Sequence, residues 1–114
     1  RAEIVALYQG AALLAFPSLL EGFGYPVLEA MACGTPVVAA GSGALAEVAG
    51  EAAVLADAAD PAALASACRR VLVDPALAAE LRAKGLERVK AFSWDRSARG
   101  ILAVHDGLLG RAIA

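Results

Sequence analysis

The sequence has 114 residues, of which 60% are hydrophobic and 19% charged, and its formal net charge is −2. This composition excludes a disordered chain, and the near-neutral charge gives no electrostatic basis for binding nucleic acid or an anionic membrane. We expect residues 1–114 to form one compact unit without a transmembrane segment, because no apolar run reaches the roughly 18 residues that a membrane span requires.

The first half of the chain alternates short helical segments with continuous apolar runs. An apolar run bounded by glycine or proline is typical of a parallel strand that is covered on both faces. Strands that alternate with short helices indicate βαβ crossovers. We therefore expect helices over residues 2–9, 26–33 and 44–48, and parallel strands over residues 12–16, 36–40 and 52–56.

From Asp60 onward the pattern is helical. Asp60-Pro61 and Asp74-Pro75 each combine an N-cap residue with proline at the first helical position, and Ser93 can cap a last helix. The predicted apolar faces are Leu64, Cys68, Val71 and Leu72, then Leu77, Leu81 and Val89, and finally Trp94, Ala98, Ile101, Leu102, His105, Leu108 and Leu109. The sequence thus predicts an α/β fold, a three-layer Rossmann-like fragment with a short parallel sheet of about three strands and a helical C-terminal region.

The stretch from Glu21 to Glu29 is the strongest candidate site. Gly22 and Gly24 allow a positive φ and the close approach of a ligand, and Pro26 suits the first helical position. The unpaired N–H groups of a first helical turn favour a phosphate. Glu29, about one turn into the helix, would accept hydrogen bonds from neutral hydroxyls such as a ribose diol. These residues indicate a nucleotide-sugar site. The alternative is that Glu29 only stabilises the helix dipole and Glu21 is a solvated loop residue.

Residues 21–40, EGFGYPVLEAMACGTPVVAA, resemble the E-x7-E signature of the retaining glycosyltransferases of family 4, the group 1 transferases with the GT-B fold. The similarity runs from about Glu3 to Gly110, through LYQGAALLAFPSLLEGFG, GSGALAEVAG, VLADAADPAALA and FSWDRSARGIL. The family's enzymes have two Rossmann-like domains. This chain resembles the second half of the C-terminal, donor-binding domain.

The resemblance implies a role for each residue of the motif. It places Glu29 on the nucleotide ribose and Glu21 on the hydroxyls of the donor sugar, and it brings backbone amides of the loop close to the sugar and phosphates. The implied donor-binding set is Glu21, Gly22, Phe23, Gly24, Tyr25, Val27 and Glu29, with Glu21 as the catalytic candidate.

The resemblance also implies the reaction, which is transfer of a sugar from a nucleotide-sugar donor with retention, without a bound metal or other cofactor. An arginine and a lysine from the first half of the domain, and a separate N-terminal domain that binds the acceptor, are absent from this sequence. We therefore expect the chain by itself to be inactive. Two alternatives are a non-catalytic nucleotide-sugar-binding or interaction fragment and, with poorer motif agreement, a nucleotide-sugar epimerase.

Four further residues could suggest a metal or redox site. Asp57 and Asp60 resemble a metal pair, but Asp60 serves as an N-cap and no third ligand is near in sequence. Cys33 and Cys68 form no metal-binding pattern. We interpret them as buried free thiols in a reducing compartment, which indicates a cytoplasmic protein.

Three other polar residues are assigned structural roles. His105 lies on an apolar helical stripe, so we interpret it as a packed residue, and Ser18 has no histidine or acid in a triad-like arrangement. GSGALAEVAG resembles the family's Gly-Gly-x-Pro-Glu turn, with Ala46 where proline is usual. We interpret Glu47 as a solvated glutamate near a helix start.

The chain begins at Arg1 and has the character of a piece of a longer product. In a doubly wound sheet of order 3-2-1-4-5-6, its strands would be the fourth, fifth and sixth. The strand over residues 12–16 would then lack its neighbour, and its edge carries neither charge nor proline. We expect the isolated chain to self-associate through this edge, through the last helix, or through both.

Overall fold

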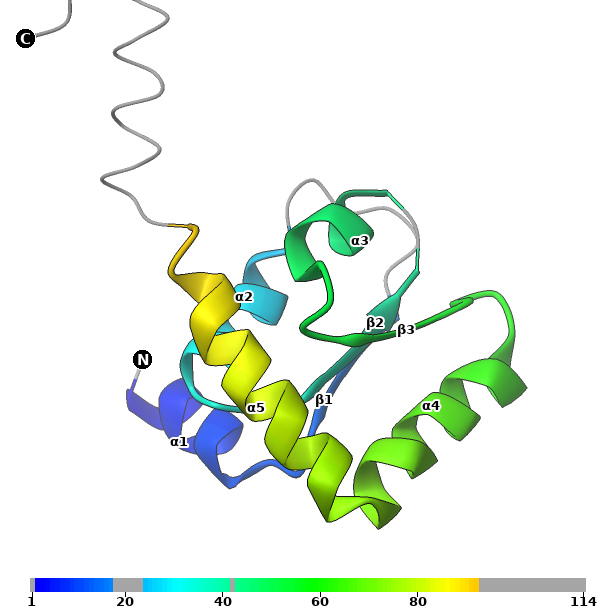
Figure 1. Cartoon of the computed structure of the whole chain (residues 1–114), viewed down its shortest axis with the longest axis horizontal. Helices are drawn as coiled ribbons and strands as arrows, with labels where there is room; N and C mark the ends of the chain where they lie inside the picture. The colour runs from blue at the N-terminus through cyan, green and yellow to red at the C-terminus, as the bar shows by residue number, and fades with distance from the viewer. Residues whose placement is uncertain (1, 18–23, 42, 93–114) are drawn as a thin grey trace, which may run out of the picture.

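The computed structural model describes residues 2–17, 24–41 and 43–92. In this part of the chain, helices alternate with strands and two longer helices follow (Figure 1). The predicted α/β class is confirmed. The elements are α1 (Ala2–Gly10), β1 (Leu14–Phe16), α2 (Tyr25–Ala32), β2 (Val37–Ala40), α3 (Gly43–Ala49), β3 (Val54–Ala56), α4 (Pro61–Val73) and α5 (Pro75–Val89). Ser93 and the predicted last helix lie outside the described residues.

The strands form a parallel sheet of order β1-β2-β3. Leu14 pairs with Val37, and Val38 pairs with Val54. β2 lies in the centre and all four of its residues are buried. This burial explains why the strand is a continuous apolar run, since a parallel strand with helices on both faces has no solvent side. β1 and β3 are two residues shorter at their start than predicted.

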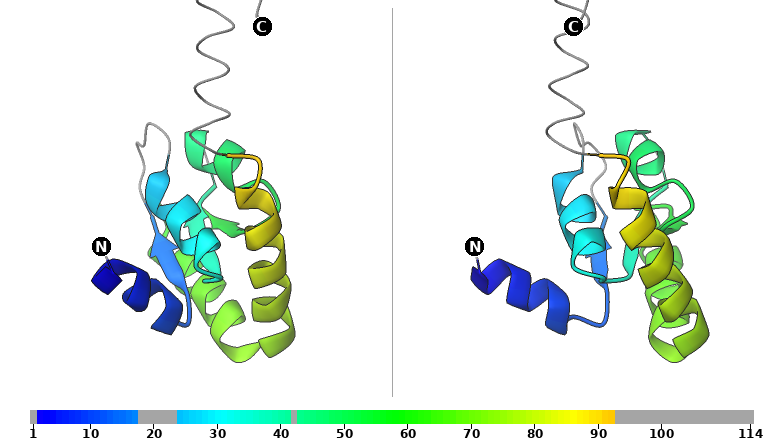
Figure 2. Two further views of the ribbon diagram at one scale, coloured as in Figure 1. Left: turned by 90° about the vertical axis from the view of Figure 1, so that its left-hand side faces the viewer. Right: turned by 60° about the vertical axis from the view of Figure 1, so that its left-hand side comes forward.

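Helices cover both faces of the sheet, as the three-layer prediction requires (Figure 2). Val37 and Ala39 of β2 belong to a core shared with α2 and α3, whereas Val38 belongs to a second core shared with α4 and α5. Successive residues of a strand point to opposite faces, so β2 supplies both cores. α5 begins in the second core with Leu81 and reaches the first near its end with Val89.

Aspartate caps begin both long helices, as predicted. The Asp60 carboxylate accepts from the N–H groups of Ala62 and Ala63 at 3.0 and 3.2 Å, and Asp74 does the same for α5. Val71 is buried on the inner face of α4, but Leu72 is 59% exposed. Including Leu72 in the apolar face was wrong, because one residue turns a helix by about 100°.

α1 is attached to the body through the connection between α2 and β2. Thr35 is 3% exposed, and its Oγ1 donates to the carbonyl of Tyr8 at 2.5 Å. The N–H of Leu14 donates to the carbonyl of Pro36 at 2.8 Å. α1 exposes Ile4, Val5 and Leu7. Among the helices that the structure describes, none combines the length and apolar character needed to cross a bilayer.

Candidate functional site

The described part of the candidate site is the start of α2. Gly24 is the N-cap, with φ 83° and ψ 44°, and Pro26 is the second helical residue, one position later than predicted. An added Cβ on Gly24 would lie 2.6 Å from Cδ2 of Leu45 in α3. The predicted positive φ of Gly24 is therefore confirmed, and the same glycine also allows close packing between two helices.

The first-turn amides of α2 are partly occupied. The Val27 N–H donates to the Gly24 carbonyl at 3.0 Å, and the Leu28 N–H donates to the same oxygen at 3.4 Å. The expectation of unpaired first-turn N–H groups is wrong for Val27, because the turn closes tightly on its N-cap residue. Glu21, Gly22 and Phe23 lie outside the described residues, so the structure does not place the first half of the motif.

Glu29 lies one turn into α2, half-buried, beside Tyr8 of α1. Burial, then the negative charge of Glu29 and of Cys33, and a hydrogen bond with Glu29 raise the pKa of Tyr8 above its ordinary value. Both residues line a groove of about 140 Å³ between the two helices. An ionised carboxylate offers about four acceptor positions, so Glu29 can hold Tyr8 and still accept from a ligand.

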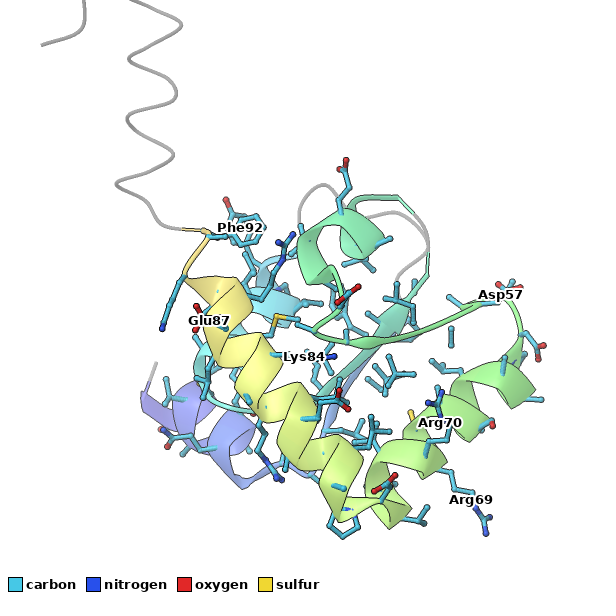
Figure 3. All side chains as sticks on the ribbon, in the orientation of Figure 1. Asp57, Arg69, Arg70, Lys84, Glu87 and Phe92 are labelled. Atoms are coloured by element: carbon cyan, nitrogen blue, oxygen red, sulfur yellow. The ribbon has the colours of Figure 1, made fainter. Side chains whose placement is uncertain are left out.

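α3 faces the start of α2. The last turn of α3 is held by hydrogen bonds from α5. Arg88 donates from Nε to the Val48 carbonyl at 2.9 Å and from a terminal nitrogen to the Glu47 carbonyl at 2.7 Å. The side chain of Glu47 is exposed, as the solvated interpretation predicted. The guanidinium carbon lies 5.1 Å from the ring centroid of Phe92, which follows α5 at the end of the molecule that α3 occupies (Figure 3).

Sequence reasoning missed Tyr8 and Arg88. Their partners lie about 20 and 40 residues away along the chain, so no local pattern of residues connects either pair. Phe92, whose ring Arg88 contacts, is the first residue of the FSWDRSARGIL segment, but nothing in that segment indicates that Arg88 is its neighbour. Both roles become visible only when α1, α3 and α5 are placed against α2.

The residues considered for metal or redox chemistry have local roles. Asp57 accepts from the N–H of Ala59 at 2.9 Å, and Asp60 is the cap of α4. In residues 2–17, 24–41 and 43–92, no three histidine, cysteine or acidic side chains are grouped as a metal site would need. Cys33 and Cys68 are free, but each is half-buried rather than buried, since Cys33 is the C-cap of α2 and Cys68 packs only partly against the second core.

Known proteins resemble the chain in sequence and in structure. The family model of the group 1 glycosyl transferases matches residues 1–88. A D-inositol 3-phosphate glycosyltransferase of Salinispora arenicola is 43% identical over 114 residues, which cover 98% of this chain and 25% of that protein. An MMP alpha-(1->4)-mannosyltransferase of Mycolicibacterium hassiacum is 40% identical over 116 residues, covering 98% of this chain and 28% of that protein.

The structural comparison agrees. A sucrose-phosphate synthase from Thermosynechococcus elongatus superposes with a TM-score of 0.82 and 39% identity over 95% of this chain and 28% of its own. The chain thus spans about a quarter of the length of the curated relatives it matches. Because the family model covers residues 1–88 and the fold agrees, the chain belongs to the group 1 glycosyl transferases.

Proposed function

We propose that the chain is a nucleotide-sugar-binding segment of a retaining glycosyltransferase, acting in the cytoplasm as part of a longer protein. The observation that carries the proposal is the start of α2, where a left-handed Gly24 precedes the helix and a half-buried Glu29 follows one turn later. Family membership and the transferase names of the relatives support sugar transfer as the reaction.

The chemistry follows from the two ends of the motif. Glu29 accepts hydrogen bonds from the ribose hydroxyls, which are neutral and therefore tolerate a carboxylate. Amides around Phe23, Gly24 and Tyr25, together with the helix dipole, receive the phosphates. The Val27 amide is omitted from this set, because it already donates within the helix. Glu21 contacts the donor sugar and is the catalytic candidate.

Electrostatic stabilisation of the leaving phosphate is the main catalytic task in such a reaction. A single helix N-terminus supplies only part of it. We propose that basic residues elsewhere in the longer protein supply the remainder and that its other domain binds the acceptor. No metal or other cofactor is required in this scheme. The residues of this chain then bind and orient the donor.

Glu29→Gln in the full-length protein tests the ribose contact. The change keeps the shape of the side chain but removes its charge. Hydrogen bonds to charged groups contribute about 1.5–3 kcal/mol, so kcat/KM for the donor should fall roughly ten- to a hundredfold. Glu47→Gln is the matched control, since Glu47 is an exposed glutamate at a neighbouring helix. Equal kinetics for the Glu29 variant and the wild type would leave Glu29 as a dipole stabiliser.

Glu21→Ala tests the other end of the motif. Binding of the free nucleoside diphosphate should be spared, whereas use of the sugar-bearing donor should fall, because only the donor presents sugar hydroxyls to this carboxylate. Calorimetric titration of the two ligands measures the difference. Equal losses for both ligands would contradict the assignment of Glu21 to the sugar.

A further inference from the structure

α5 contacts both helices that meet at the candidate site. Gly85 and Arg88 are three residues apart, so they lie on one side of α5. At Gly85 the helix approaches α2 closely, since an added Cβ there would lie 3.1 Å from Cγ of the buried Met31. One turn later Arg88 donates hydrogen bonds to backbone carbonyls of α3. α5 therefore provides a common support for α2 and α3.

Arg88 binds the C-terminal end of α3, where backbone carbonyls need hydrogen-bond donors from outside the helix. The carbonyls of Glu47 and Val48 belong to the last turn of α3, whose carbonyls have no partner within the helix. A positive charge is also favourable at a helix C-terminus. Gly50 follows with φ 55°, and an added Cβ on it would lie 3.2 Å from Nε of Arg88. The backbone after α3 thus closes around the guanidinium.

α3 transmits this contact to the start of α2. The helix has only seven residues, about two turns, so Leu45 near its start lies close to the carbonyls at its end that Arg88 binds. Leu45 is 1% exposed, and its Cδ2 occupies the space in which Gly24 would carry a Cβ. Arg88, α3, Leu45 and Gly24 are consequently in continuous contact, although Arg88 and Gly24 are 64 residues apart in the sequence.

We propose that Arg88 is a positioning residue for donor binding. By fixing the C-terminal end of α3, it sets where Leu45 meets Gly24 and so where the first turn of α2 lies relative to the ligand. The proposal rests on the proposed function, since it takes the start of α2 as the donor site. Arg88 itself does not contact the donor.

Steady-state kinetics of the full-length protein test the proposal with Arg88→Met and Arg88→Lys. Met keeps the length of the side chain and removes both hydrogen bonds, whereas Lys keeps the charge and one point of donation. Mutation of a residue that acts on a binding site through intervening contacts usually changes the ligand affinity by roughly two- to thirtyfold. We expect Arg88→Met to raise the donor KM by that factor and leave the acceptor KM unchanged. Arg88→Lys should recover part of the loss.

Two control variants separate positioning from stability. Val71→Ala destabilises the core on the opposite face of the sheet, away from α3, and Arg82→Met removes an exposed arginine of the same helix. Neither should change the donor KM at a temperature where all variants stay folded. A donor KM for Arg88→Met no higher than that of Val71→Ala would overturn the proposal. A wild-type protein that uses no nucleotide sugar would instead refute the proposed function.

Discussion

Replacing Gly24 with alanine should destabilise the fold through two separable effects. At φ 83° an L-residue pays roughly 1–2 kcal/mol for the left-handed conformation, offset by about 0.4–1 kcal/mol from the stiffer unfolded chain. The new methyl group would also lie 2.6 Å from Cδ2 of Leu45, and overpacking of this kind costs about 1–3 kcal/mol. We expect a net loss of about 1–4.6 kcal/mol, centred near 3 kcal/mol, in the free energy of unfolding.

Gly34→Ala is the matched control for the steric part. Gly34 has φ 73°, but an added Cβ there meets no atom within 4 Å. This variant should therefore pay only the conformational cost, about 1 kcal/mol. Urea unfolding of both variants in the same full-length protein, followed by circular dichroism, measures the difference.

A double-mutant cycle then assigns the steric part to its partner. In a Leu45→Ala background the space beside Gly24 is open, so Gly24→Ala should cost no more than Gly34→Ala does. Equal losses for Gly24→Ala and Gly34→Ala in the otherwise unchanged protein would refute the reasoning. They would mean that α3 shifts to admit the methyl group without cost.

Three further predictions concern α1 and the sheet edge. Thr35→Val should cost about 1 kcal/mol, because it keeps the shape of the side chain but loses the hydrogen bond to the Tyr8 carbonyl; an unchanged free energy of unfolding would contradict this. Glu29→Gln should lower the pKa of Tyr8 toward its ordinary value in a near-ultraviolet titration, although burial keeps it somewhat raised. Because the folded pKa exceeds the unfolded value of about 10, the stability contributed by Tyr8 should be complete below that pH and lost as the pH rises through the folded pKa. The isolated chain should self-associate in sedimentation experiments at micromolar concentration, since β1 lies at the edge of the sheet; a clean monomer would exclude it.

The order of elements could be predicted from the sequence because its local signals agree. Apolar runs gave the strands, and two Asp-Pro pairs gave the starts of α4 and α5. Gly24 was expected at positive φ and has it. These features depend on a few neighbouring residues, so the amino-acid order is enough to predict them.

The features that the sequence did not reveal depend on distant segments. Whether the Val27 amide is free depends on how tightly the first turn closes, and the contact of Leu45 with Gly24 depends on where α3 lies. Tyr8 beside Glu29 and Arg88 beside α3 each require two packed helices. No periodicity or spacing in the sequence encodes these distances.

The residues of α5 that support the candidate site are placed around the helix axis by their distance in sequence from Asp74. Asp74 is both the C-cap of α4 and the N-cap of α5, so no spare residue separates the two helices. Inserting one residue into the first turns of α5, after Asp74, would rotate everything after it by about 100° around the axis of α5 and advance it by about 1.5 Å. Gly85 would then face away from Met31, and Arg88 away from α3. The number of residues between Asp74 and Arg88 therefore matters as much as their identity, and a length change within this part of α5 should be far more harmful than one in the turn at residues 57–59.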